Sequence, residues 1–302
     1  MRTRLLTPYL FILPAAIVFC SFVLLPIFGS IVMSFQDWAS GIHPLFCGFS
    51  NYAHTLSDAV FWRAIMNNAV ILVGSLLFQL PLAGLLAVLL NYRTVCRSVF
   101  RTSFFAPIVM PTIAIAFLWM NIYSPVDGIA THLCRLIHGK DFFYQWLSTG
   151  STSVFLPAPA LFWIFITICW QYTGFHMVLY MAGIAAIPDD IFEAARLDGA
   201  GECQIVRHVI LPSIRPTIAV SATLSIIGSL KYFDLIYLMG GALSEMDREV
   251  VATYIYRLAF EQGQGRFGQG SAAAVILLLL TLAIVIPLQL KHKKSERLFE
   301  ES

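Results

Sequence analysis

The sequence predicts an all-α polytopic membrane protein with six transmembrane helices. Of its 302 residues, 58% are hydrophobic and only 12% are charged, which is about half the roughly 25% charge of a soluble domain. Apolar stretches without Asp, Glu, Lys or Arg also recur at about the 20 residues that a helix needs to cross a bilayer. Because no linker or repeat divides the chain, residues 1–302 are predicted to form a single membrane-spanning domain.

The six spans follow from these apolar stretches. The first begins after two arginines and is too long for a signal-peptide core, so we expect it to remain as a helix. The fourth follows a Ser/Thr-rich run with prolines, and the fifth continues past Lys231 and Asp234. The predicted spans are about 9–35, 64–92, 102–123, 160–187, 216–239 and 270–290.

Lys and Arg residues are distributed unevenly between the two sides of these spans. The N-terminus, the two even-numbered connections and the C-terminus hold two, three, three and four of them, twelve in all, whereas the other connections hold six. Cytoplasmic segments carry the excess of positive charge. We therefore expect both termini and the loop 188–215 in the cytoplasm. The formal net charge of +2 gives no indication of a nucleic-acid partner.

The cytoplasmic loop 188–215 contains the charged sequence EAARLDGAG at 193–201. Asp190 and Glu193 have the spacing of a capped helix start, where the positive helix end favours acidic groups. The first short helix is expected to run to about Asp198, with Gly199 as its left-handed stop.

A second short helix is expected from about Glu202 to Ile210. Helices of about two turns are marginal alone in water, and no other cytoplasmic segment is available to cover the apolar face of this pair, so we expect a partner. The alternative is an amphipathic connector resting on the bilayer, although the polar face here is mainly acidic. The expected apolar face consists of Phe192, Ala195, Ile205 and Val209.

The ordered motif in this loop resembles the EAA loop of permease subunits of ATP-binding-cassette (ABC) importers, in the branch of maltose-type and glycerol-3-phosphate-type sugar permeases. It comprises Glu193-Ala194-Ala195, Asp198-Gly199-Ala200, Ile210-Leu211-Pro212 and Pro216. Similar stretches cover nearly the whole chain: Gly48-Phe49-Ser50-Asn51-Tyr52, Ala106-Pro107, Trp119, Pro125-Val126-Asp127-Gly128, Phe233-Asp234-Leu235-Ile236-Tyr237, Gly240-Gly241, Tyr254-Ile255-Tyr256, Phe260 and Gly270-Ser271-Ala272-Ala273-Ala274.

One stretch departs from the pattern of that family. Sugar permeases often continue the glycine pair with proline and a threonine-rich stretch, whereas this chain has Ala242-Leu243-Ser244-Glu245. The shape of that outer loop therefore does not follow from the resemblance.

The resemblance implies a type I ABC importer permease fold with a cytoplasmic coupling helix. It implies a non-enzymatic subunit that forms half of the path for a sugar or related solute, such as a polyol phosphate, in the bacterial inner membrane. The implied partners are a second homologous permease, two ATPase subunits and an extracytoplasmic solute-binding protein. ATP and Mg would be bound by the ATPase, with no cofactor on this chain. The implied coupling residues are Glu193, Ala194, Ala195, Asp198, Gly199 and Ala200, with Glu193 pairing with the ATPase and Gly199 permitting the turn.

Polar residues inside the spans are candidates for the substrate path, because a polar group in lipid must find partners. Lys231 and Asp234 would lie three residues apart on one helical face, where they could neutralise each other; a structural ion pair and a role in the path are both open. Aromatic, amide and imidazole groups suit sugars, although His176 can equally be a packing residue. The candidates are Trp170, Gln171, His176, Lys231, Tyr232 and Asp234, whereas Asn67, Asn68, Gln79 and Asn121 are expected to join helices.

Two other classes of membrane protein remain as alternatives. The chain contains no phosphate-binding G-x-x-x-x-G-K-[ST] loop, so it must obtain energy from another source. An ion-gradient-driven secondary transporter could use Lys231 and Asp234 as a charge relay, but the paired interrupted helices of such carriers are not evident. A membrane enzyme is disfavoured because neither a protease nor a hydrolase motif is present.

Overall fold

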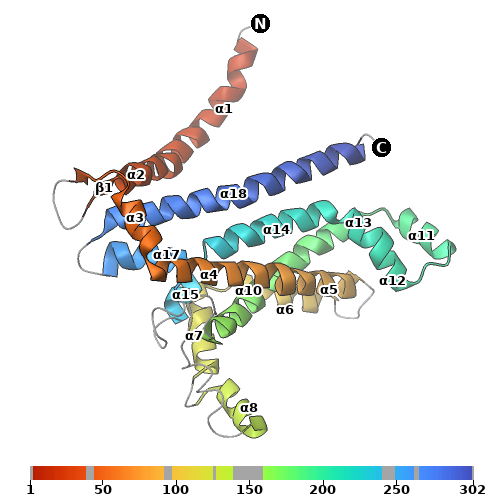
Figure 1. The fold of residues 1–302 in the computed structure, drawn as a ribbon. Helices are drawn as coiled ribbons and strands as arrows, with labels where there is room; N and C mark the ends of the chain where they lie inside the picture. The colour runs from red at the N-terminus through yellow and green to blue at the C-terminus, as the bar shows by residue number, and fades with distance from the viewer. Residues whose placement is uncertain are drawn as a thin grey trace. The chain divides into compact units, whose positions relative to one another are not determined.

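The computed structural model is almost entirely helical (Figure 1). Its described residues form two compact units, Met1–Phe61 with Val251–Leu280 and Trp62–Val250 with Thr281–Ser302. The single-domain assignment stays a prediction. The structure describes residues 3–38, 44–91, 97–124, 127–138, 159–239, 249–261 and 265–300.

The first unit begins with a long apolar helix that continues through a π-helical turn. A two-stranded antiparallel hairpin follows, in which Gln36 pairs with Phe46 and Asp37 with Leu45. The unit closes with two helices from the C-terminal part of the chain. Its elements are α1 (Thr3–Phe19), η1 (Cys20–Leu24), α2 (Leu25–Ser34), β1 (Gln36–Asp37), β2 (Leu45–Phe46), α3 (Ser50–Ser57), α17 (Val251–Tyr256), η5 (Arg257–Glu261) and α18 (Phe267–Glu300), the last as far as Leu280.

Tyr254 joins the parts of the first unit. Its fully buried ring lies 5.5 Å from that of Phe61. The Tyr254 hydroxyl donates a hydrogen bond to Asp58 Oδ2 at 2.8 Å and accepts one from Gln269 Nε2 at 3.3 Å. This network links residues nearly two hundred positions apart, because a buried hydroxyl needs hydrogen-bond partners.

The second unit is a bundle in which α10 is the central helix. Helix α10 packs along α5 and α6 and also contacts α14, while α15 packs on α7. Its elements are α4 (Ala59–Gly74), η2 (Ser75–Gln79), α5 (Leu80–Asn91), α6 (Arg97–Val109), α7 (Thr112–Ile122), α8 (Ile129–His138), α10 (Pro159–Ala185), α11 (Asp189–Leu197), α12 (Glu202–Ile205), η3 (Val206–Ile210), α13 (Leu211–Ser213), α14 (Arg215–Leu230) and α15 (Asp234–Met239).

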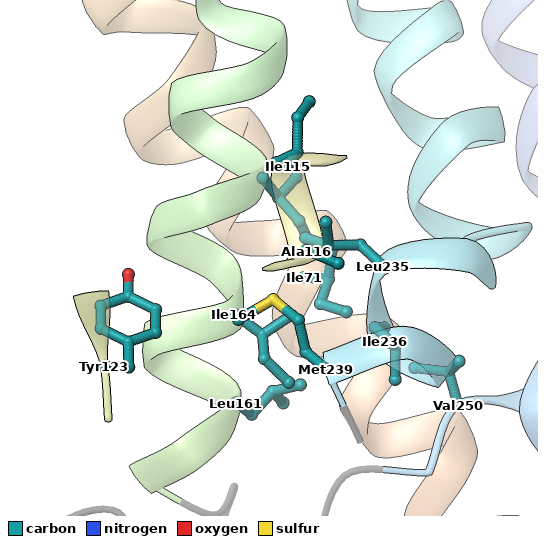
Figure 2. Close-up of a cluster of buried hydrophobic side chains, with 11 residues drawn as sticks. Ile71, Ile115, Ala116, Tyr123, Leu161, Ile164, Leu235, Ile236, Met239 and Val250 are labelled. Atoms are coloured by element: carbon teal, nitrogen blue, oxygen red, sulfur yellow. The ribbon is translucent and has the colours of Figure 1, made fainter. Parts of the chain in front are cut away.

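Two apolar clusters hold this bundle together. In the first, side chains of α7, α10 and α15 converge around Ile115, Ile164 and Leu235, as Figure 2 shows. The second lies near the coupling loop and includes Ala87 of α5 and Ile184 of α10.

The helices of the described residues include up to six candidate membrane spans if each bent pair is counted as one span. Four are continuous and two are bent, and this helical membrane architecture confirms the predicted fold class. The continuous spans are Phe11–Ser34, Ala59–Asn91, Leu161–Ala185 and Phe267–Leu290, and the bent pairs are Arg97–Val109 with Thr112–Ile122, at 101°, and Glu202–Ser213 with Arg215–Leu230, at 67°.

Two predicted spans are not the continuous helices that the apolar pattern suggested. The span 102–123 bends at Met110 and Pro111, because proline has no backbone N–H and disfavours helical backbone in the residue before it. The span 216–239 is interrupted as well. Helix α14 ends at Leu230, and α15 begins only at Asp234.

Candidate coupling loop and transport cavity

The loop 188–215 contains two short helices joined by a tight turn. Helix α11 begins at Asp189, immediately after Pro188, so that Asp189 and Asp190 both lie in its first turn. These carboxylates stabilise the positive end of the helix. The expected cap spanning Asp190 and Glu193 is wrong, because Asp190 already lies inside the helix, where its Oδ1 accepts a hydrogen bond from the N–H of the next residue, Ile191.

Gly199 ends this first helix with a positive φ of 77°. Its N–H donates to the Arg196 carbonyl at 3.1 Å, and the N–H of Ala200 donates to the Ala195 carbonyl at 3.0 Å. This pair of bonds is the Schellman arrangement, which requires left-handed backbone at the residue after the helix. The left-handed stop predicted at Gly199 is therefore confirmed.

The second helix is longer than predicted. It starts after Gly201, whose N–H donates to Oε1 of Gln204 at 2.8 Å. It then continues through η3 and α13 to Ser213, past the expected end at Ile210. Pro212 lies in the last turn of this continuation, in α13, which directly follows the π-helical segment η3.

The predicted apolar face of the loop is covered by the chain itself, so the expectation that it has no internal cover is wrong. Phe192, Ala195, Ile205 and Val209 pack into the second apolar cluster, with the ends of α5 and α10. Sequence analysis missed this cover because it placed α5 and α10 entirely within the membrane.

A different face of α11 is open to solvent. Ile191 is 44% exposed and Leu197 is 88% exposed, and Ala194 between them is also exposed. Spacing by three residues places these side chains on one side of the helix. The sequence analysis did not include Ile191 and Leu197 among the coupling residues, although their helical spacing indicates a shared face.

Charged side chains line a groove of about 550 Å³ whose wall also includes Phe192 and Ile205 of the covered face. Glu193 lines the groove together with Arg97 and Arg196. Within the described residues, no ion pair involves Glu193 or Arg196. The predicted coupling residues Glu193, Ala194, Asp198 and Gly199 are exposed, and Ala195 and Ala200 are half-buried.

A second polar region lies inside the bundle, where a cavity of about 480 Å³ opens. Three irregularities contribute to its wall: the π-helical turn η2, the bend between α6 and α7, and the break between α14 and α15. The lining residues are Ser75, Gln79, Ile108, Thr112, Ile168, Tyr172, Phe175, His176, Leu224, Ser225, Gly228, Ser229, Lys231, Tyr232, Phe233 and Asp234.

Four of the six predicted path residues line this cavity: His176, Lys231, Tyr232 and Asp234. His176 Nδ1 lies 2.7 Å from Ser221 Oγ, which fixes the imidazole ring. Gln171 lies behind the wall, where its Oε1 accepts a hydrogen bond from the Tyr232 hydroxyl at 3.2 Å. The cavity therefore presents tyrosine and imidazole groups whose orientations are set by buried partners.

Trp170 lies apart from the cavity lining. Its side chain is 38% exposed, and its ring meets that of Trp119 edge-to-face at 5.6 Å. This position is typical of an aromatic side chain packed at a helix surface. The structure thus separates Trp170 from the other predicted path residues.

Lys231 and Asp234 do not share a helical face, contrary to the sequence prediction. The helix breaks between them, and within the described residues no ion pair joins them. Both side chains are exposed in the single chain. They contribute one charge of each sign to the cavity wall.

The four polar residues expected to join helices have different roles in the structure. Asn67 donates to the Glu249 carbonyl and Asn68 to the Ser229 carbonyl, so both join distant segments as predicted. Asn121 instead bonds to the Phe117 carbonyl of its own helix. Gln79 lines the cavity, and no hydrogen bond of its amide is found among the described residues.

The comparisons with known proteins agree with this geometry. Residues 79–292 match the family described as "Binding-protein-dependent transport system inner membrane component". The chain belongs to this family. It is 34% identical to the probable ABC transporter permease protein YurN of Bacillus subtilis (strain 168), over 84% of this chain and 85% of YurN. It is 30% identical to the lactose transport system permease protein LacF of Rhizobium radiobacter, over 83% of each chain.

A solved structure has the same fold. The chain superposes with a TM-score of 0.82 and 25% identity on a chain of a bacterial ABC transporter involved in the import of the acidic polysaccharide alginate, covering 97% of this chain and 96% of that one. The chain is therefore a membrane-embedded permease subunit of an ABC importer and is not itself an enzyme. The comparisons do not support the ion-gradient-driven alternative.

Proposed function

We propose that this permease passes a neutral saccharide through the cavity, driven by an ATPase that docks on the loop 188–215. The permease lies in the bacterial inner membrane with both termini in the cytoplasm, as the distribution of Lys and Arg indicates. It works with a second permease, two ATPase subunits and an extracytoplasmic binding protein. The family description and the alginate transporter support such an assembly.

The coupling role is supported by the shape of α11. Its inner face is fixed to the bundle, while Ile191, Ala194 and Leu197 form an apolar outer face. A leucine side chain as exposed as Leu197 is unfavourable in water, so its burial against a partner would stabilise the assembly. Glu193 is exposed, lines the groove on another side of α11, and is placed to bind a cationic group of the ATPase. A force on this face would be transmitted to α10 through the turn at Pro188 and to α14 through the second short helix.

ATP and Mg are proposed to bind to the ATPase alone. This chain lacks the glycine-rich lysine motif that holds nucleotide phosphates in such motors. Among the described residues, no group of three or more His, Cys, Asp or Glu is placed to hold a metal ion. The permease therefore supplies the solute path and the docking site for the ATPase, while ATP hydrolysis by the partner supplies the energy.

The cavity lining supports a saccharide as the solute. The Tyr172 and Tyr232 rings meet edge-to-face at 6.1 Å and offer apolar surfaces to the C–H faces of a sugar. Gln79, Ser225 and Ser229 offer neutral hydrogen-bonding groups to sugar hydroxyls. LacF, one of the relatives, is named for lactose transport.

The charges of the lining favour a neutral solute over an acidic one. Lys231 and Asp234 are the lining residues with formal charges at neutral pH when His176 is neutral. Since they carry opposite signs, the wall has no surplus positive charge for a carboxylate or phosphate. The combination of aromatic and neutral polar groups with balanced charge is the observation that carries the proposal.

The proposal is tested by reconstituting the full importer in liposomes and measuring ATP hydrolysis with different solutes. The panel contains lactose, maltose, arabino-oligosaccharides, alginate oligosaccharides and glycerol 3-phosphate. We expect one of the neutral saccharides to stimulate hydrolysis and the acidic compounds to have little effect. Stimulation by an acidic compound alone would contradict the neutral cargo. Uptake that needs an ion gradient, and not ATP, would contradict the ATPase coupling.

A further inference from the structure

Helix α8, between the third and fourth spans, has an apolar face that the described part of the bundle leaves open. Ile129, Leu133 and Leu136 are 63%, 55% and 84% exposed. Their spacing of four and then three residues places them in one stripe along the helix. A stripe of three large apolar side chains is unfavourable in water and indicates a surface that something covers.

The opposite side of α8 is fixed to the end of α7. The N–H of Gly128 and the hydroxyl of Thr131 both donate to the Ser124 carbonyl, at 3.0 and 2.6 Å. Thr131 is buried, whereas the apolar stripe is not. The side of α8 that carries Thr131 therefore faces the protein, and the apolar stripe faces away from α7. Figure 1 shows α8 just beyond the end of α7, away from α11 and α12.

The position of α8 along the chain indicates its depth in the membrane. The bent candidate span of α6 and α7 ends at Ile122, and α8 begins at Ile129. The hydrogen bond from the Thr131 hydroxyl to the Ser124 carbonyl keeps the start of α8 beside that end of the span. We therefore expect α8 near the bilayer surface.

The basic residues of α8 match an anionic or zwitterionic surface. His132 and Arg135 are both exposed, and helical geometry places them beside one edge of the apolar stripe. An interfacial helix has this pattern, with its apolar side in the acyl boundary and its cations among lipid phosphates. Long basic side chains can reach from such a position to the headgroups.

We propose that α8 lies in the headgroup layer of the outer leaflet, with Ile129, Leu133 and Leu136 in the acyl boundary. Arg135 and His132 then contact lipid phosphates. This contact holds the outer end of α7. The opposite end of α7 begins with Thr112, which lines the cavity. The proposal does not depend on the identity of the transported solute.

The test places a benzophenone amino acid at position 136 or 129 of the complete importer. The complex is reconstituted in vesicles of phosphatidylethanolamine and phosphatidylglycerol, irradiated, and its adducts are identified by mass spectrometry. Leu197 of the coupling helix is the matched control, because its exposure of 88% is nearly that of Leu136. We expect lipid adducts at 129 and 136 and adducts with the ATPase at 197.

Lipid adducts at 129 and 136 that persist when the binding protein is added support the proposal. Adducts with the binding protein or the second permease at these positions, or an absence of lipid adducts at both, would overturn it. Two positions are used so that a misfolded variant at one does not decide the result. The control separates the two proposals: absence of ATPase adducts at 197 counts against the coupling role and leaves the lipid contact of α8 standing.

Discussion

The coupling loop and the transport cavity are both polar regions of this permease, and they are built in opposite ways. In the coupling loop, the turn at Gly199 is formed by hydrogen bonds between residues three to five positions apart. In the cavity, the bond from Tyr232 to Gln171 joins residues 61 positions apart, and that between His176 and Ser221 joins residues 45 apart.

This difference indicates which changes each region can tolerate. The loop is shaped by local backbone preferences, so a local substitution should distort it while the bundle remains folded. The cavity exists only while several helices keep their packing, so a change at a helix crossing should remove it together with the fold. The predictions below test this division, from the largest expected effect to the smallest.

The largest effect is expected at Gly174, where α10 crosses α6. A Cβ at this position would overlap the backbone carbonyl of Phe104. Gly174→Leu should therefore separate the two helices and cost about 3 kcal/mol or more, at the upper end of overpacking effects. We expect little folded permease in the membrane and a strongly lowered melting temperature in detergent.

Gly84 of α5 provides the control for this substitution. A Cβ at Gly84 would meet its nearest neighbour, the ring of Tyr180, at 3.8 Å, which is ordinary contact. Gly84→Ala should retain a normal level of permease. Normal folding of Gly174→Leu would show that the crossing does not hold the cavity together.

The next effect is expected in the coupling loop, at Gly199. Gly199→Val places a β-branched residue in left-handed backbone, which costs roughly 1–2 kcal/mol and disfavours the turn. We expect normal insertion into the membrane but loss of solute-stimulated ATP hydrolysis and of uptake. Gly201→Val is the matched control, because Gly201 has an ordinary φ of −73° only two residues away. Equal activity of the two variants would refute the role of the turn.

A smaller effect is expected from Gln79, which offers its amide to the cavity. Gln79→Leu removes hydrogen bonds to the solute, each worth about 1 kcal/mol, or roughly fivefold in affinity. The solute concentration for half-maximal ATP hydrolysis should rise by about this factor, with the amount of permease unchanged. Asn121→Leu is the control, since that amide bonds within its own helix. An unchanged solute dependence of Gln79→Leu would exclude this residue from the path.

The smallest effect is expected from any interaction between the Lys231 and Asp234 charges. Because the helix breaks between them and no ion pair joins them in the described structure, neither charge should need the other. The effects of Lys231→Gln and Asp234→Asn on uptake should therefore multiply in the double variant. Recovery of uptake in the double variant relative to Asp234→Asn would instead show a structural ion pair, since removing one member of such a pair leaves the other unpaired.

The turn at Gly199 was predictable from sequence because one residue with unusual backbone freedom decides its shape. The six apolar spans were evident for a similar reason, since length and hydropathy act locally. The position of the loop against α5 and α10 was not predictable. It depends on where two helices end relative to the membrane, and the apolar pattern does not mark that boundary.

The cavity was only partly predictable. Polar residues within spans pointed to His176 and Tyr232, but Gln79 was grouped with Asn67 and Asn68 as a residue that joins helices. The bend at Pro111 had a sequence signal in the proline itself. The break after Leu230 had no comparably clear sequence signal, because no proline occurs between Leu230 and Asp234.

The most direct test of the account is a structure of the assembled importer in lipid. The account predicts that the ATPase covers Ile191, Ala194 and Leu197, with a cationic side chain of the ATPase within hydrogen-bond distance of the Glu193 carboxylate. A complete assembly in which this face of α11 contacts only water or lipid headgroups, with the ATPase bound elsewhere, would contradict it.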